Sequence, residues 1–277
     1  MAYSSYDTIL FEKRNRIATV TLNRPDRLNA VSEEMTVELL DVFTEIEKDE
    51  EVWTIIVTGA GRALCSGADV AKVPEAGKEV GLFGVQTRGE PYLGTFWQWE
   101  PPSEATPPFR QMAKPIICAV NGICAGAGLD MVTTCDIAIA SDKASFLDPH
   151  VSIGLASGRE AVRLARVIPM NIAMRLALMG KHERMGAERA YQLGLVSEVV
   201  PHDDLMARAW EIAETVNKNA PLAVRGTRLG IRNGMSLPLP EAELLAESYR
   251  LRVAMSQDAR EGPIAFNEKR DPVWKVT

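Results

Sequence analysis

The sequence predicts an α/β fold with a helical C-terminal region. Two stretches, residues 53–72 and 115–136, each lead from an apolar β-forming run through a turn of small residues into a helical start. From about residue 202 to the end, the pattern is helical only. Repeated units of strand, turn and helix place their turns at one end of a sheet. We therefore expect a sheet-containing core over residues 1–201 and a separate helical region over residues 202–277.

Length and composition fit a soluble globular protein with one large domain or a domain plus an appendage. The chain has 277 residues, of which 46% are hydrophobic and 25% are charged. Its net charge of −6 argues against nucleic acid or an anionic membrane as partner, although a local basic cluster can still meet an anionic cofactor. The N-terminus shows no leader pattern, and no apolar run is long enough to span a membrane, so we expect a cytoplasmic location.

The four cysteines are predicted to be buried free thiols. They lie in apolar or small-residue surroundings without CxxC spacing, at Cys65, Cys118, Cys124 and Cys135. Buried free thiols are typical of a reducing compartment.

The N-terminal elements follow from alternation and helical spacing. Apolar and polar residues alternate over residues 8–12 and 16–22, which predicts an antiparallel hairpin. Apolar residues then recur at helical spacing up to about residue 50, with Ser32 as N-cap and acids in the first turn. A buried strand over residues 53–57 follows this helix.

Residues 74–113 form a different kind of segment, in which Gly, Pro and charges are mixed with aromatic side chains such as Trp97 and Trp99. A loop of this length in a compact domain is usually a lid or a mobile segment. Two interpretations stay open: a surface loop whose aromatic side chains pack into the core, and a wall of a substrate pocket.

The second half continues with a strand, a loop and then helices. Residues 136–141 predict a strand, and residues 144–160 a loop that returns to the same sheet end. Three amphipathic helices follow, the last of them ended by Gly194, and residues 195–201 close the sheet with a short strand. The helices expected in the C-terminal region cover residues 203–219, 222–234, 240–257 and 258–270.

The turn Gly126-Ala127-Gly128 is a candidate anion site. It lies between an apolar strand and a helix, where backbone N–H groups lack partners and the helix dipole is positive. Small residues let a substrate oxygen approach these groups closely. A second turn of this type contains Gly67 and Ala68, so two turns can face one substrate atom.

The ordered motifs of the chain resemble those of the crotonase, or enoyl-CoA hydratase/isomerase, family. They span nearly the whole sequence: IATVTLNRPDRLNAV, IIVTGAGRALCSGADV, KPIICAVNGICAGAGLDMVTTCDIAIAS, GAERAYQLGLVSEVV and EGPIAFNEKR. The resemblance implies a crotonase-like spiral of ββα units, with a C-terminal helical region that makes trimers, often as dimers of trimers. It also implies an acyl-CoA thioester substrate, whose coenzyme A is part of the substrate and not a bound cofactor. The enolate would be held by the N–H groups of Ala68 and Ala127.

The family pattern also implies residues that contact coenzyme A. These would be Arg27 and Leu28 in one loop, the backbone of Ser66, and Phe266 and Lys269 in the C-terminal helix of a neighbouring subunit. The two cations can meet phosphates. Taken alone, each cation fits a solvated surface equally well, and Phe266 fits packing within the helical region.

The sequence departs from the family at the two glutamates that hydratases place over the reacting carbons. Asp130 stands at the first position and His150 at the second. Asp is shorter by one methylene, and His has an ordinary pKa near 6.5, so both still transfer protons but with different reach and pKa. Structural roles also stay open for both, and Asp148 or Glu160 could be the acid instead. The other two histidines, His182 and His202, are predicted to lie at the surface or at helix starts.

The function predicted from these residues is that of an enoyl-CoA hydratase, a lyase in which Asp130 and His150 handle water and the α-proton. An isomerase, a hydrolase of a C–C or thioester bond, and a non-catalytic CoA-ester-binding protein are the alternatives. The resemblance implies that the aromatic segment lines the acyl pocket, where Trp97 and Trp99 would favour a bulky or ring-bearing acyl chain. No metal-ligand spacing and no GxGxxG fingerprint is present in the sequence.

Overall fold

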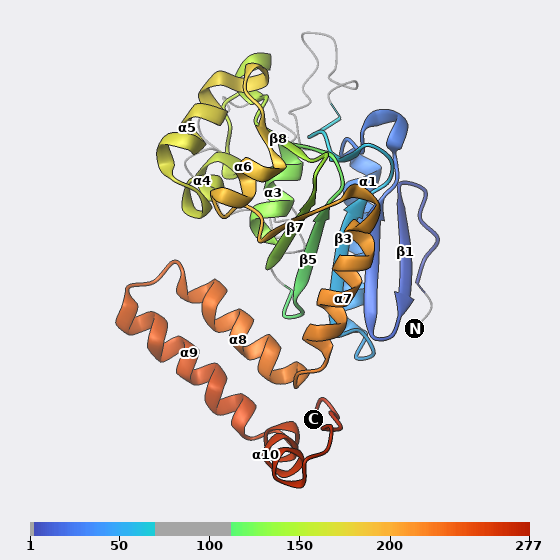
Figure 1. The fold of residues 1–277 in the computed structure, drawn as a ribbon, viewed down its shortest axis with the longest axis vertical. Helices are drawn as coiled ribbons and strands as arrows, with labels where there is room; N and C mark the ends of the chain where they lie inside the picture. The colour runs from blue at the N-terminus through green and yellow to red at the C-terminus, as the bar shows by residue number, and fades with distance from the viewer. Residues whose placement is uncertain (1–2, 70–111) are drawn as a thin grey trace, which may run out of the picture.

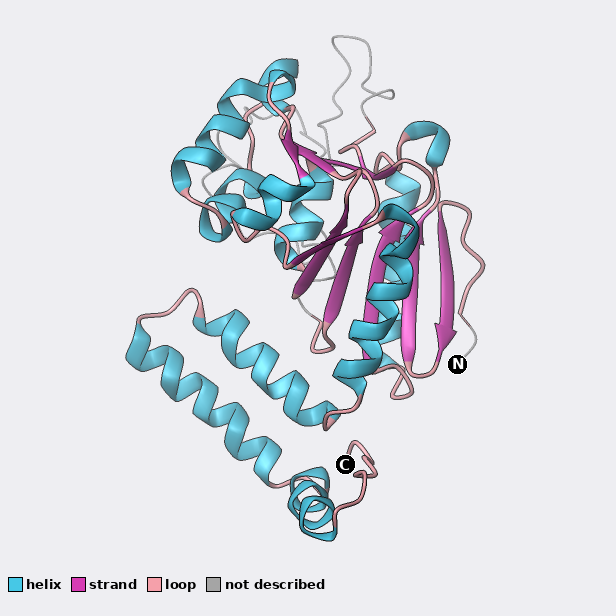
Figure 2. Cartoon of the chain, viewed as in Figure 1, coloured by secondary structure: helices cyan, strands magenta, loops and turns pink. Residues whose placement is uncertain are grey.

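The protein is described by a computed structural model that covers residues 3–69 and 112–277. It is built on two sheets with helices packed around them (Figures 1 and 2). The main sheet has six strands in the order β1-β2-β3-β5-β7-β10. These strands are β1 (Ile9–Arg14), β2 (Ile17–Leu22), β3 (Thr54–Gly59), β5 (Ile116–Val120), β7 (Ile137–Ser141) and β10 (Glu198–Val200).

The N-terminal hairpin begins the main sheet. Strands β1 and β2 pair antiparallel, with Ile9 opposite Leu22, and the remaining neighbours in this sheet pair parallel. Helix α1 (Glu33–Lys48) begins after Ser32, whose side chain accepts a hydrogen bond from the Met35 N–H at 3.2 Å. The predicted hairpin, N-cap and helix are therefore confirmed.

A smaller second sheet lies at the end where the central parallel strands finish. Its strands are β4 (Ala63–Cys65), β6 (Ile123–Ala125), β8 (Ser145–Leu147) and β9 (Met185–Gly186). Each of β3, β5 and β7 is followed at once by a strand of this sheet, and β6 runs into helix α3 (Ala127–Thr134). The chain thus repeats one unit that contributes a strand to each sheet.

Helices surround the second sheet and return the chain to the first. After β8 come the short 3-10 turn η4 (His150–Ile153) and helices α4 (Arg159–Val167), α5 (Met170–Met179) and α6 (Ala187–Gln192). Gly194 follows α6 with a positive φ of 80°, as a C-terminal glycine does, and the chain then enters β10.

The central strands β3 and β5 of the main sheet are buried on both faces. Ile55 and Val57 belong to the larger apolar core, whereas Ile56 between them belongs to a second core on the opposite face. Helix α7 (Leu205–Asn217) covers this second core, to which it contributes Leu205, Ala209 and Ala213. The first helix of the C-terminal region is therefore packed on the sheet.

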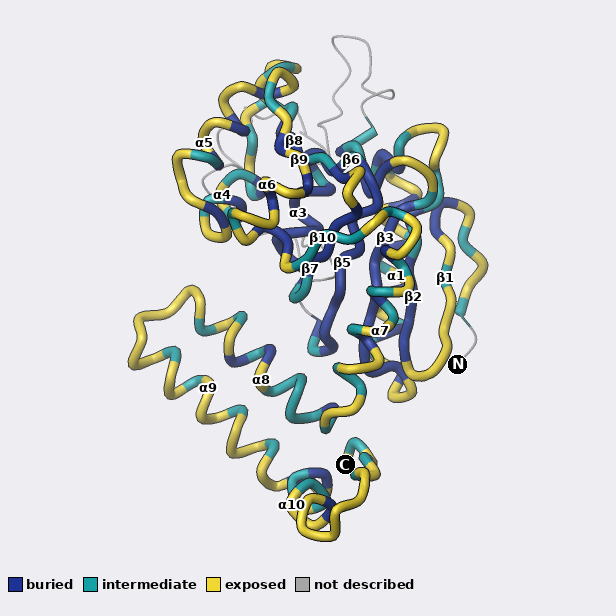
Figure 3. The backbone as a smooth tube through the Cα atoms, in the orientation of Figure 1, coloured by how far each residue is buried: buried dark blue, intermediate teal, exposed yellow. Residues whose placement is uncertain are grey.

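The last three helices extend beyond the core as an arm (Figures 1 and 3). They are α8 (Pro221–Gly234), α9 (Leu239–Ala254) and α10 (Asp258–Glu268). Asp136, directly before β7, fastens α8 to the core, because its carboxylate accepts hydrogen bonds from Arg228 at 2.6 Å and Arg232 at 2.9 Å. Helix α9 contains no buried residue. No helix of the described ranges is long and apolar enough to cross a membrane.

The predicted α/β fold class is confirmed, and so are four buried free cysteines. The three-residue strands β4, β6 and β8 were not predicted one by one, because a run this short has too few residues to show alternation. The helical start expected near residue 70 and the aromatic segment with Trp97 and Trp99 lie outside the described residues.

Candidate active site

The two predicted small-residue turns lie against each other. A Cβ placed on Gly126 would lie 3.3 Å from the Gly67 Cα, and one on Gly67 would lie 3.7 Å from the carbonyl oxygen of Ala125. Both glycines have positive φ, 112° at Gly67 and 51° at Gly126, which an L side chain rarely adopts. Backbone conformation therefore favours glycine at both positions, and the close approach of the two turns adds to this at Gly126.

Among the residues that the structure describes, the N–H group of the residue after each glycine has no acceptor. In the parallel bridge of Val31 with Ala68, the bonds are made by the neighbouring Gly67 carbonyl and Asp69 N–H, at 2.8 and 2.9 Å. Ala127 is the first residue of α3, after the N-cap Gly126, so its N–H precedes the helical bonds. Within the described ranges, neither the Ala68 nor the Ala127 N–H donates a hydrogen bond.

His150 lies over the second turn. Its ring atoms Cε1 and Nε2 are 3.5 and 3.9 Å from the place where a Cβ on Gly126 would be. The side chain is 13% exposed and begins η4, directly after Pro149. The Cε1–Nε2 edge of the His150 ring thus borders the second turn.

The other ring nitrogen of His150 is bound by Asp148. The Nδ1 atom lies 2.5 Å from Asp148 Oδ1, and the second carboxylate oxygen accepts a hydrogen bond from the Ser157 hydroxyl. The hydrogen bond between His150 and Asp148 raises the pKa of His150, whereas burial acts in the opposite direction. Burial alone would raise the pKa of Asp148, which is fully buried, but the bonds from His150 and Ser157 hold it below its ordinary value. The pair therefore favours a charged imidazolium beside a charged carboxylate.

Asp130 lies one turn into α3 and is paired with arginines of α4. Its Oδ1 accepts a hydrogen bond from Arg163, and its Oδ2 lies 4.0 Å from Arg159 Nη2. Burial raises the pKa of Asp130, which is 5% exposed, while the two guanidinium groups oppose that rise. The structure thus places Asp130 at the α3–α4 contact.

Three of the five residues predicted to contact coenzyme A lie together. Arg27 and Leu28 end the 3-10 turn η1 (Pro25–Arg27), where Leu28 has a φ of 52°. The Ser66 N–H donates to the Leu28 carbonyl at 3.0 Å, and its hydroxyl donates to the Arg27 carbonyl at 3.4 Å. This loop therefore borders the first turn.

The other two predicted contacts lie elsewhere in the chain. Phe266 is 83% exposed on α10, and Lys269 is the exposed residue that ends this helix with a φ of 55°. In Figure 1 α10 lies at the far end of the arm, away from α3 and β8. Within one chain, these residues do not reach the paired turns.

Sequence reasoning did not identify the supporting groups of this site. It named Asp148 only as an alternative acid, and it did not name Ser157 or Arg163 at all. A signal for Asp148 was present, because a carboxylate two residues from a histidine can bind its ring. The i, i+4 pair of Arg159 and Arg163 on one helix face was a comparable signal for Asp130. His182 and His202 do begin or end short helices near the surface, as predicted.

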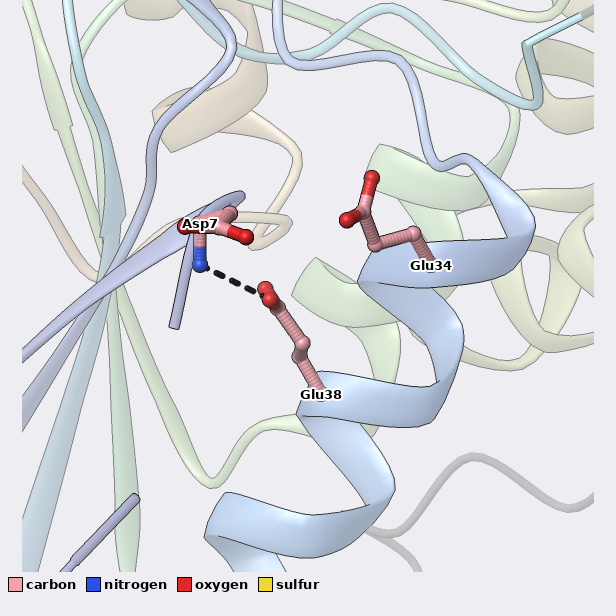
Figure 4. A group of neighbouring side chains, drawn as sticks. All are labelled: Asp7, Glu34 and Glu38. Atoms are coloured by element: carbon pink, nitrogen blue, oxygen red, sulfur yellow. Dashed lines mark hydrogen bonds between the residues drawn. The ribbon is translucent and has the colours of Figure 1, made fainter. Parts of the chain in front are cut away.

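One group of carboxylates in the described residues is close enough to share a cation: Asp7, Glu34 and Glu38 (Figure 4). The Glu38 carboxylate is already occupied, because it accepts hydrogen bonds from the N–H groups of Asp7 and Thr8 at 2.8 and 2.9 Å. The cluster fastens the start of β1 to α1, and we assign it no metal.

A repeated α/β unit that brings two bare amides under a titratable histidine defines a class of enzyme that can polarise a carbonyl group. The enoyl-CoA hydratase/isomerase family model matches residues 12–277. The chain belongs to this family, and it is a hydratase-like enzyme of the lyase type that processes acyl-CoA.

Its relatives support this assignment along the whole chain. A mevalonyl-coenzyme A hydratase of Aspergillus fumigatus is 34% identical over 262 residues, which cover 94% of this chain and 91% of the relative. An (E)-benzylidenesuccinyl-CoA hydratase of Thauera aromatica is 32% identical over 269 residues, covering 96% of this chain and 98% of the relative. A crystal structure of an enoyl-CoA hydratase/isomerase from Mycobacterium paratuberculosis is 58% identical with a TM-score of 0.85, and covers 99% of this chain and 100% of that one.

Proposed function

We propose that the chain adds water across the α,β double bond of an acyl-CoA thioester. The observation that carries this proposal is the pair of bare N–H groups, at Ala68 and Ala127, beside the His150 ring. Addition of water to an enoyl thioester passes through an enolate, whose charge gathers on the thioester oxygen. Two backbone donors stabilise that charge, each by on the order of 3 kcal/mol.

Two groups are proposed to move protons above the enolate. His150 carries a proton on the ring that faces the paired turns and can deliver it to the α carbon. For the second group, which receives a proton from the attacking water, the family pattern supplies Asp130.

Coenzyme A is proposed to bind along the loop of Arg27, Leu28 and Ser66, as part of the substrate. Phe266 and Lys269 would complete this site from a neighbouring subunit, since in their own chain they lie on the arm. A homotrimer, alone or as a dimer of trimers, is the proposed assembly. The arm supports it, because α9 buries no residue and its Leu244 side chain is 72% exposed.

The acyl group is proposed to be bulky or ring-bearing. This proposal depends on Trp97 and Trp99, and one relative is named for a benzylidenesuccinyl-CoA substrate. A panel of crotonyl-CoA against aromatic and cyclic enoyl-CoA esters tests it, and a clear preference for crotonyl-CoA contradicts it. The proposed location is the cytoplasm, which suits four buried free thiols, and neither nucleic acid nor a membrane is a proposed partner.

The reaction itself is tested by product analysis in H₂¹⁸O and in D₂O. Hydration gives a 3-hydroxyacyl-CoA with ¹⁸O on the β carbon and one solvent deuteron on the α carbon. Isomerisation gives no ¹⁸O, and thioester hydrolysis gives a free acid with ¹⁸O in its carboxyl group. Either of the latter two as the main product contradicts the proposal.

The Ala127→Pro variant tests the paired amides directly. Proline removes the N–H but is tolerated at the first position of a helix, which is where Ala127 lies. We expect turnover to fall on the order of 100-fold or more, while the melting temperature changes little. Ala187→Pro is the matched control, since Ala187 begins α6 after Gly186 in the same way. Wild-type turnover in Ala127→Pro would exclude this amide as a donor.

A further inference from the structure

The carboxylate of Asp130 already faces two cations. Its two carboxylate oxygens face two different guanidinium groups of α4, Oδ1 that of Arg163 and Oδ2 that of Arg159. Arg163 also donates to the Thr134 hydroxyl at 2.8 Å, which holds it against α3. These cations oppose the rise in the pKa of Asp130 that burial causes, because protonation would leave them uncompensated. The negative charge of Asp130 therefore serves the contact between α3 and α4.

Glu160, on the same helix, is placed differently. It is the second residue of α4 and is 7% exposed. Within residues 3–69 and 112–277 its carboxylate makes no hydrogen bond and no ion pair. Such a group is a candidate for a functional role.

The Glu160 side chain bends back towards the loop that leaves His150. Its Oε2 lies 3.6 Å from the place where a Cβ on Gly158 would be. The preceding residue, Ser157, binds the Asp148 carboxylate that holds the His150 ring. The charge of Glu160 contributes to the raised pKa of both His150 and Asp130, as it would from a position near both.

We propose that Glu160, and not Asp130, is the carboxylate that takes the proton from the attacking water, with His150 as the acid on the other carbon. This inference rests on the proposed hydration. The water oxygen forms a bond to the β carbon as one of its protons passes to Glu160. The π electrons move to the α carbon, which takes the proton of His150 Nε2. Proton transfer from Glu160 to His150 then restores both groups, so that one water is added in total.

The test is the Glu160→Gln variant, which keeps the size of the side chain and removes its basicity. We expect kcat for hydration, measured with the best enoyl-CoA of the panel, to fall at least 100-fold, with KM and melting temperature nearly unchanged. Glu188→Gln is the matched control, because Glu188 is the exposed second residue of α6. Glu160→Asp, which restores a carboxylate with less reach, should recover part of the loss.

A second measurement separates the roles of the two groups. Exchange of the α-proton of butyryl-CoA in D₂O needs His150 and the bare amides but no attacking water. In Glu160→Gln this exchange should persist while hydration is lost. Loss of both together, with an intact fold, would make Glu160 a support for His150 and overturn the assignment.

Asp130→Asn decides between the two carboxylates. If it loses hydration as deeply as Glu160→Gln at an unchanged melting temperature, or if Glu160→Gln stays within about threefold of the wild type, Glu160 is not the base. These outcomes leave the proposed hydration standing as long as the wild type forms the 3-hydroxyacyl-CoA. Absence of that product in the wild type contradicts the proposed function itself.

Discussion

Asp148, in the loop after β8, and Asp130, at the contact of α3 with α4, are both almost fully buried, but their partners differ. Asp148 binds the imidazole of His150, which gains and loses a proton near neutral pH. Asp130 binds the guanidinium of Arg163, which keeps its charge at every pH that the protein meets. The first pair can therefore take part in proton transfer, and the second supplies a constant charge that holds two helices together. Burial of a carboxylate near a site does not by itself indicate chemistry, because the partner decides what the carboxylate can do.

Replacing His150, the titratable partner of Asp148, should have the largest effect on kcat. In His150→Gln, the side chain keeps a polar group near Asp148 but has no proton to deliver, so we expect kcat to fall on the order of 10²- to 10⁴-fold. His182→Gln, at an exposed position, is the control and should leave kcat unchanged. A modest loss in His150→Gln, of about threefold or less, would remove the distinction between the two pairs.

Removing the ion pair of Asp130 with Arg163 should lower the stability of the fold more than it lowers turnover. Asp130→Asn removes a carboxylate charge that the mostly buried Arg163 faces, and we expect the free energy of unfolding to fall by on the order of 3 kcal/mol. Urea denaturation measures this loss. Glu183→Gln breaks the exposed pair with Arg175 and should produce no measurable change. An equally stable Asp130→Asn would show that this pair does not hold α3 to α4.

Removing the charge of Asp148 should change the pH dependence. The carboxylate raises the pKa of His150, so the imidazolium that donates the proton persists to higher pH in the wild type. Asp148→Asn keeps an acceptor for Nδ1 but lowers this pKa, and the fall of kcat on the alkaline side should move to lower pH by on the order of one unit. The pH profile of kcat measures the shift. A movement to higher pH, or none, would mean that Asp148 does not set the protonation of His150.

Local features of the chain could be predicted from the sequence, whereas the partners of the buried carboxylates could not. The hairpin, α1 and the helices from α4 onward follow from local periodicity, and the paired turns follow from glycines in two similar stretches. The strands β4, β6 and β8 are too short to show periodicity. The partners of Asp130 and His150 depend on the distance in space between segments up to 33 residues apart, as for Arg163 and Asp130, and no local pattern encodes that distance. The sequence therefore indicated which residues carry charge at the site, and the structure showed what each charge faces.

Strands β4 and β6 are parallel neighbours in the second sheet, and each leads into one of the two glycine turns. Adjacent strands lie roughly 4.8 Å apart. Two N–H donors that share one oxygen, each at about 2.9 Å, can be no further than about 5.8 Å from each other. The spacing of any hydrogen-bonded sheet is thus already suitable for a two-donor site. A chain that uses one local shape twice on neighbouring strands obtains such a site from its backbone register alone, and side chains around it are free to diverge between reactions.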